Sequence, residues 1–174
     1  MRHIPKPEAG EYDPYAKEYF DLIPDDGMVI QHMRDSLKTV EEMVSGLSEE
    51  QMITPCAPGE WTIKEILLHV IDDERIYAYR TLRAARDDKT ELPGFEQDDY
   101  IVPSCANERS VESILEEYRA VRESTITLLK YLPEDALMRS TVANNHAVTV
   151  RALAYHMAGH EMHHIVSIRE NYLR

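Results

Sequence analysis

The sequence predicts an all-α protein, a four-helix bundle with long connecting loops and an irregular N-terminal arm. Three observations support this fold class. Four segments of about 20 residues carry apolar residues at helical spacing. No Val- and Ile-rich alternation of strand length lies between them. The length of 174 residues suits one domain with a single core. We expect an arm over residues 1–26 and a bundle domain over residues 27–174.

The N-terminal arm is rich in proline and in aromatic residues. Its four prolines exclude a long helix, because proline lacks an amide hydrogen and its ring clashes with the preceding turn. We expect its aromatic side chains to lie on the bundle or on a second subunit. The first bundle helix is predicted to begin near Gly27 and to end near Gly46. Its apolar residues recur at spacings of three and four, at Ile30, Met33, Leu37, Val40, Val44 and Leu47.

Capping motifs predict where the next helices begin. Residues 48–51 resemble a short capping-box turn. Thr62, followed by Glu65, forms a second capping box and predicts a helix that continues to about Arg86. Trp61 immediately precedes this cap, and we interpret it as a structural staple residue at the start of the helix.

The second half of the chain contains a long polar connection and two further helices. Residues 87–109 show no helical period, so we expect a loop, and loops of this length are usually functional or packed covers. Ser110 is predicted to cap a third helix that ends before Pro133. Thr149 is predicted to open a fourth helix that runs almost to the C-terminus.

Composition excludes several classes of partner. The 32 acidic residues outnumber the 19 lysines and arginines, and the net charge of −13 repels nucleic-acid phosphates. No apolar run reaches the ~20 residues of a membrane span, and the first residues of the arm lack the apolar region of a secretory signal. Cys56 and Cys105 form no CxxC pair. We therefore expect a cytoplasmic protein with two reduced thiols and with no nucleic-acid or membrane partner.

Two histidines interrupt the apolar stripe of the fourth helix. The stripe runs through Val150, Leu153 and Met157, and the helical period then places His160 and His164 on the same face. His156 and His163 fall beside the stripe, where a flank or a solvent-exposed face suits them better.

His69 is the only histidine of the second helix, and it lies three residues after the apolar Ile66. If Ile66 faces the core, His69 converges with His160 and His164 inside the bundle. Three neutral imidazoles at about 2.0–2.1 Å would hold a divalent metal, with zinc or nickel preferred, and would leave one position open. The alternative for each is a core histidine satisfied by one hydrogen bond.

The segment from His160 to His164 also matches the pattern H-E-x-x-H. In zincin hydrolases this spacing supplies two zinc ligands and a glutamate that acts as general base. Such enzymes take their third ligand from further along the chain, but only Glu170 offers a carboxylate after His164. A zincin-type hydrolase is therefore the minor alternative. Glu161 remains a candidate general base or a residue that supports the ligands.

Charged residues on the second helix are weaker candidates. Asp73 follows His69 by one turn and could orient an imidazole, although a run of acids on a helix is usually a solvated face. Arg75, Arg80 and Arg83 could bind an acidic substrate. Pairing with carboxylates at helical spacing is the simpler interpretation of these arginines.

The order of these motifs resembles the DinB/YfiT-like proteins over almost the whole chain from Gly27 onward. The resemblance implies a four-helix bundle in which His69, His160 and His164 bind nickel or zinc, and since many members are dimers it also implies a homodimer. It also implies that some relatives use low-molecular-weight thiols, activated at the metal. The segments that carry the resemblance are residues 61–69, 73–80, 92–100 and 159–164.

These observations predict that the protein binds a divalent metal and that it is a metal-dependent enzyme acting on a small-molecule substrate. The metal would activate a water molecule or a low-molecular-weight thiol for hydrolysis or group transfer. The alternative is a non-catalytic protein whose metal is structural or absent. A structural site is closed by four protein ligands, whereas a catalytic site keeps a position open.

Overall fold

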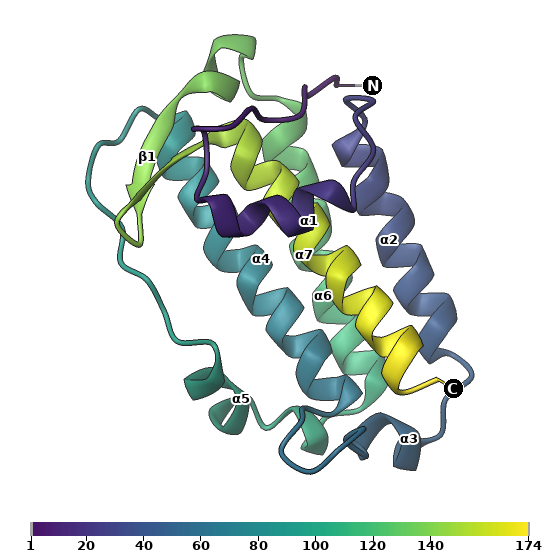
Figure 1. Ribbon diagram of the computed structural model, residues 1–174. Coiled ribbons are helices and arrows are strands. Elements are labelled where there is room, and N and C mark those ends of the chain that lie inside the picture. The colour runs from purple at the N-terminus through teal and green to yellow at the C-terminus, as the bar shows by residue number, and fades with distance from the viewer. Residues whose placement is uncertain (1, 174) are drawn as a thin grey trace.

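The computed structural model describes residues 2–173. Met1, the first residue of the predicted arm, and Arg174, the last residue of the predicted bundle domain, lie outside the described residues. Four long helices form an all-α bundle, which confirms the predicted fold class (Figure 1). None of the described helices is both long and apolar enough to span a bilayer. The long helices are α2 (Val29–Val44), α4 (Ile63–Ala85), α6 (Val111–Lys130) and α7 (Val150–Asn171).

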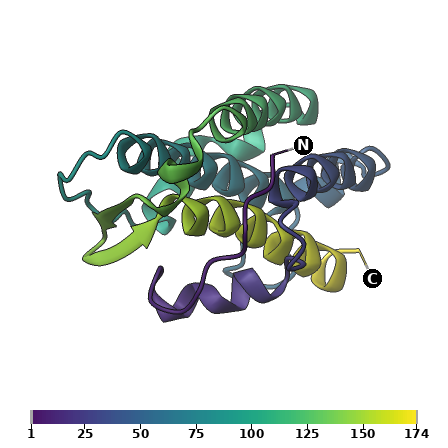
Figure 2. The ribbon, with the colours of Figure 1, turned by 90° about the horizontal axis from the view of Figure 1, so that it is seen from above.

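In the view from above, α6 and α7 lie on opposite sides of the bundle, with α2 and α4 between them (Figure 2). Helix α2 packs on α6 and α7, and α4 packs on the same two helices. Helices α2 and α7 run in one direction, and α4 and α6 run in the other (Figure 1). Because α4 and α6 are parallel, the segment between them must return along the whole length of the bundle.

The long helices α4, α6 and α7 begin at the predicted capping residues. The Thr62 hydroxyl accepts a hydrogen bond from the Glu65 amide at 3.2 Å, and the Glu65 carboxylate accepts one from the Thr62 amide at 2.7 Å. The hydroxyls of Ser110 and Thr149 each accept a hydrogen bond from the amide three residues later, at 3.2 Å. The short helix α3 (Glu49–Ile53) also begins with the predicted capping box.

The connection between α4 and α6 is not the continuous loop that the sequence predicts. It contains α5 (Asp98–Ser104), which packs on α4, and the 3-10 helix η2 (Ala106–Glu108). Helix α5 has only seven residues and includes Pro103, so it shows no helical period in the sequence. Cys105 ends it in the left-handed conformation, with φ of 50°.

A β-hairpin precedes α7 where the sequence analysis predicts no strand. It follows the 3-10 helix η3 (Glu134–Met138) and pairs β1 (Ser140–Ala143) with β2 (His146–Thr149) in antiparallel register. Asn144 and Asn145 make the turn with φ of 50° and 65°. Two positive φ angles are typical of the two-residue hairpin turn, which asparagine tolerates, so this dipeptide was the missed signal.

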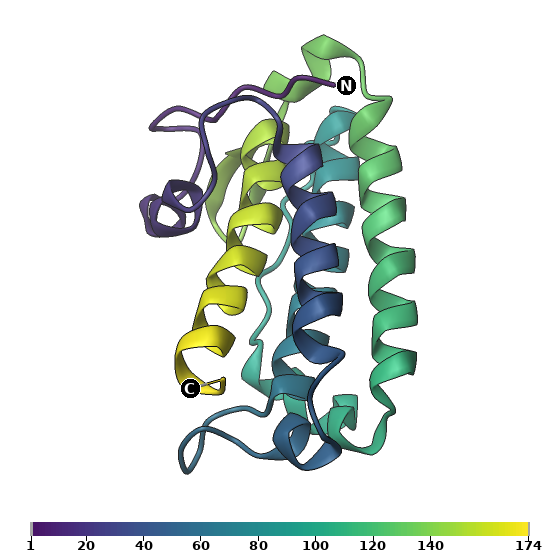
Figure 3. The same cartoon turned by 90° about the vertical axis from the view of Figure 1, so that its right-hand side faces the viewer.

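The N-terminal arm packs on the bundle of its own chain. The 3-10 helix η1 (Pro14–Ala16) leads into α1 (Lys17–Asp21), which crosses the outer face of α7 (Figure 3). The Phe20 side chain is buried, and the carbonyl of Ile4 accepts a hydrogen bond from the Tyr155 hydroxyl at 3.1 Å. The arm therefore shares the core of the domain.

Two apolar clusters fill the bundle, one nearer the arm and hairpin and one nearer α3. On each of the four long helices, buried polar side chains lie at or near the boundary between the two clusters. We call this set the polar layer. It consists of Ser36, His69, Asp73, Glu74, Arg122, His160 and Glu161.

Gly159 allows α1 to approach α7 closely. A Cβ atom added at Gly159 would lie 2.3 Å from the carbonyl oxygen of Tyr19. Because a backbone carbonyl cannot rotate aside as a side chain can, we expect Gly159→Ala to displace α1 and to cost about 1–3 kcal/mol. The checks are chemical denaturation and the rate of proteolysis within the arm. Gly46→Ala is the control, because its Cβ would meet open space, and equal losses in the two variants would contradict the prediction.

Candidate metal centre

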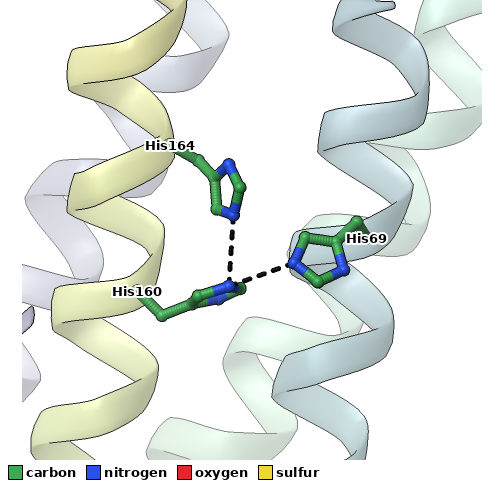
Figure 4. A group of neighbouring side chains, drawn as sticks. All are labelled: His69, His160 and His164. Atoms are coloured by element: carbon green, nitrogen blue, oxygen red, sulfur yellow. Dashed lines mark hydrogen bonds between the residues drawn. The ribbon is translucent and has the colours of Figure 1, made fainter. Parts of the chain in front are cut away.

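The structure brings together the three histidines selected from the sequence. His69 projects from α4, and His160 and His164 project one turn apart from α7 (Figure 4). The Nε2 atom of His160 lies 3.0 Å from Nε2 of His69 and 3.1 Å from Nε2 of His164. One nitrogen from each ring lies within 4.8 Å of the others. Nitrogens that bind one ion at about 2.0–2.1 Å are roughly 3–3.5 Å apart, so the separations of His160 from His69 and from His164 fit a shared cation.

Asp73 lies next to His160, on the side of the ring opposite the histidine cluster. Its Oδ2 atom lies 3.3 Å from Nδ1 of His160 and 3.6 Å from Nε2 of His156. Among the described residues this buried oxygen has no well-formed hydrogen bond. A cation on Nε2 of His160 would strengthen the Nδ1–H as a donor toward Asp73, as in carboxylate–histidine–metal arrangements. The orphaned oxygen therefore also fits a metal at this site.

Burial keeps the histidines neutral. It lowers the pKa of His160 to about 3, although Asp73 opposes the shift. Burial, followed by the neighbouring His160 and His69, lowers the pKa of His164 to about 2. The pKa of His69 is also lowered, mainly by burial. All three rings are consequently unprotonated at pH 7, which is the form that binds metals.

Aromatic rings hold the imidazoles in place. The ring centroid of Trp61 lies 4.9 Å from that of His69, so this residue also contacts the site, beyond its predicted staple position. Tyr19 from the arm meets His160 edge to face at 5.5 Å. These contacts restrict ring rotation and keep the nitrogens convergent.

The prediction that His156 lies on a flank or a solvent face is wrong. His156 is buried and stacks on Tyr77, with ring centroids 3.8 Å apart and an interplanar angle of 3°. The N-terminal half of α7 is buried on nearly every side because the arm covers its outer face, so its apolar stripe alone does not define the buried face. His163 is exposed, as expected.

Glu161 points away from the histidine cluster. Its carboxylate accepts hydrogen bonds from the Ser36 hydroxyl on α2 and the Tyr118 hydroxyl on α6. It also forms an ion pair with Arg122 at 2.9 Å. Both oxygens are thus engaged on the α2 and α6 side of α7, whereas His160 faces α4. This arrangement favours a structural role for Glu161 over that of a general base.

Arg122 links the four long helices. From α6 its guanidinium donates to Glu74 on α4 at 2.7–3.1 Å and pairs with Glu161 on α7. It also donates to the carbonyl of Met33 on α2. The Arg122 side chain is 1% exposed. Burial raises the pKa of Glu161, and the two carboxylates hold the pKa of Arg122 above its usual value despite burial.

The acidic run on α4 is not the solvated face that the sequence favours. Asp73 and Glu74 are buried, the first behind His160 and the second against Arg122. Arg75 follows the simpler interpretation, since it pairs with Asp72 three residues earlier on the helix, and it also pairs with Glu117 on α6. Arg83 pairs with Asp88, which lies beyond the end of α4 and not at helical spacing. Arg80 does not follow that interpretation either, because it is buried at the wall of a cavity.

Two cavities adjoin the cluster, one at His160 and the other at His164. The arm cavity, of about 290 Å³, includes His160 and Asp73 and extends beneath the N-terminal arm. The C-terminal cavity, of about 480 Å³, includes His164 and Trp61 and also contains Cys56. Cys56 and Cys105 are both exposed, and they are not joined in a disulfide. Two of the three imidazoles, those of His160 and His164, therefore line a cavity.

The fold and the site together define a class of protein, a four-helix bundle with three convergent histidines in its interior. A sequence profile of the DinB superfamily matches residues 32–168, and the chain belongs to this superfamily. The resemblance stated from the sequence is thereby confirmed.

Two individual relatives share about a quarter of their aligned residues with this chain. A protein of Oceanobacillus iheyensis named "putative metal-dependent hydrolase" is 25% identical over 82% of this chain and 86% of its own length. A Geobacillus thermodenitrificans protein of the same name is 26% identical over 63% of this chain and 60% of its own.

Two solved structures share the fold. YfiT from Bacillus subtilis, titled "a probable metal-dependent hydrolase with an unusual four-helix bundle topology", aligns with a TM-score of 0.74 and 16% identity over 95% of this chain and 90% of its own. A mycothiol-dependent maleylpyruvate isomerase aligns with a TM-score of 0.67 and 12% identity over 84% of this chain and 61% of its own.

Replacing Arg122 with methionine is expected to destabilise the fold strongly. The change leaves two buried carboxylates without their cation, and breaking a buried ion pair in this way costs about 3–5 kcal/mol. Denaturant unfolding measures the loss. Arg119→Met on the same helix removes an exposed pair with Glu41 and should cost at most about 1 kcal/mol. Comparable losses in the two variants would contradict the structure.

The metal-free protein should lose stability as the pH falls below about 6.5. The unfolded histidines bind protons near that pH, whereas His160 and His164 in the folded state resist protonation to about pH 3 and pH 2. The unfolded state therefore gains protons first, at up to about 1.4 kcal/mol per pH unit for each group. Denaturation midpoints measured from pH 7 to pH 4 give the slope. His164→Gln should reduce it and His163→Gln should not; an unchanged slope in His164→Gln would refute the assignment.

Proposed function

We propose that this protein is a metal-dependent enzyme in which His69, His160 and His164 hold one divalent cation, nickel or zinc. The observation that carries the proposal is the convergence of three neutral imidazole nitrogens beside a buried carboxylate. Three protein ligands leave room in the coordination sphere, and cavities adjoin the cluster. Both features support a catalytic site over a closed structural one.

When bound, such a cation lowers the pKa of a coordinated water or thiol toward neutrality. The chain's own residues prepare the site. Asp73 holds the proton of His160 on Nδ1 and so directs the lone pair of Nε2 into the cluster. Trp61 fixes the ring of His69, and Tyr19 covers His160 from the arm. Burial of these groups limits access by bulk water, which strengthens electrostatic interactions in the site.

Hydrolysis of a small-molecule substrate is the first candidate reaction. The names of the Oceanobacillus and Geobacillus relatives support it. Transfer to a low-molecular-weight thiol is the second, and a specific observation favours it. The arm cavity is lined by His160 and the C-terminal cavity by His164, so the cluster offers a separate cavity to each of two reactants. The isomerase with the same fold is named for a thiol cosubstrate.

Metal content tests the ligand assignment. Protein purified without an affinity tag should contain about one equivalent of divalent metal by elemental analysis. The His160→Ala, His164→Ala double variant should lose it, because neutral imidazoles are the proposed ligands. His163→Ala is the matched control from the same helix and should retain the metal. Full occupancy in the double variant would rule out the proposed site.

Activity assays separate the candidate reactions. Loaded protein is screened against ester and amide substrates alone, and against electrophiles with added thiols. Glu161→Gln then tests the zincin alternative, in which loss of the general base costs about 10²–10⁴ in rate. We expect a change of less than tenfold at equal metal loading, because Glu161 is bound to Arg122. Absence of every activity from the metal-loaded protein would favour the non-catalytic alternative.

A further inference from the structure

Arg80 is a buried cation at the wall of the arm cavity. Its side chain extends from α4, and the residue is only 5% exposed. Its Nη2 donates to the carbonyl of Pro93 at 3.0 Å, and its guanidinium carbon lies 4.8 Å from the ring centroid of Tyr77 and 5.9 Å from that of Phe95. Across residues 2–173, no carboxylate lies within ion-pair distance of it. The neighbouring Arg83, by contrast, pairs with Asp88.

A buried guanidinium without an anionic partner is costly unless other groups replace its hydration. The Pro93 carbonyl and the aromatic faces compensate Arg80 in part. A guanidinium has five N–H donors, and the described residues use a single nitrogen of Arg80. The remaining donors are available to a molecule that enters the cavity. Arg80 is thus suited to receive a ligand anion.

The other charges around the cavity do not take this role. Asp13 pairs with His146 at 2.8 Å, and Asp73 serves the histidine cluster. Glu96 and Asp98 are exposed. These acids disfavour a phosphate dianion more strongly than a singly charged carboxylate, which also matches the planar guanidinium fork. The lining of the cavity also includes six aromatic side chains, those of Tyr12, Tyr15, Tyr19, Phe20, Tyr77 and Phe95.

We propose that the arm cavity binds substrates in which a carboxylate is attached to a small apolar or aromatic body. The carboxylate binds Arg80, the body packs on the aromatic walls, and the opposite end of the molecule faces His160. This names a substrate class for the proposed metal-dependent enzyme and rests on that function. The volume of about 290 Å³ limits the substrate to a small molecule, since ligand pockets usually span roughly 300–1,000 Å³.

Binding to the metal-free protein tests the proposal, because a carboxylate could otherwise coordinate the metal directly. The probes are 3-phenylpropanoate and hexanoate, each compared with its neutral amide by calorimetric titration after chelation of metal. We expect each carboxylate to bind the wild-type protein about 10- to 100-fold more tightly than its amide, as a charge-assisted hydrogen-bonded contact allows. In Arg80→Gln this preference should vanish.

Two further variants control for folding and for charge. Arg83→Gln removes a cation from the same helix outside the cavity lining and should keep the full preference. Arg80→Lys retains the charge without the planar fork and should keep a reduced preference, even if Arg80→Gln fails to fold. Equal binding of acid and amide by the wild-type protein, or full preference in Arg80→Lys or in folded Arg80→Gln, would overturn the proposal. Loss of metal binding alone would overturn the proposed function but leave this result intact.

Discussion

The ion cluster around Arg122 fixes how α7 is rotated, and the candidate metal centre depends on that rotation. The first half of α7 is buried on almost every side, so apolar packing alone does not select one face for the histidines. Arg122 and its partners hold Glu161 on the α2 and α6 side. Because successive residues on a helix are about 100° apart, fixing Glu161 there turns the preceding His160 toward α4 and Asp73.

The polar layer gathers the buried charged and polar groups, which are costly to remove from water, in one cross-section of the bundle. Each of its buried charges is held by partners from other helices, while the apolar clusters on either side supply the favourable burial. In this layer the oxygen of Asp73 is left without a well-formed hydrogen bond, and the Nε2 atoms of the histidines face one another. Incomplete satisfaction next to two cavities is what distinguishes a ligand site from a structural network.

The segments outside the four long helices help to form the arm cavity beside the polar layer. The arm crosses α7, and the hairpin and the long connection after α4 complete the walls of the arm cavity. Proteins with 12–16% identity retain the same bundle, so the fold tolerates wide changes in sequence. Side chains of the arm and loops therefore offer a means of changing what the cavity accepts while the bundle and Arg80 on α4 stay in place.

The sequence alone determined the four long helices, their capping residues and the shared phase of His69, His160 and His164. These properties are local, since periodicity and capping depend on residues within one or two turns. Only the tertiary structure decided that Glu161 faces Arg122, that Asp73 and His156 are buried, and that Arg80 lines a cavity. Those outcomes depend on which helix lies opposite each face, and the same H-E-x-x-H spacing fits either arrangement. The hairpin and α5 also required the structure, because segments of four to seven residues are stabilised mainly by packing against the rest of the chain.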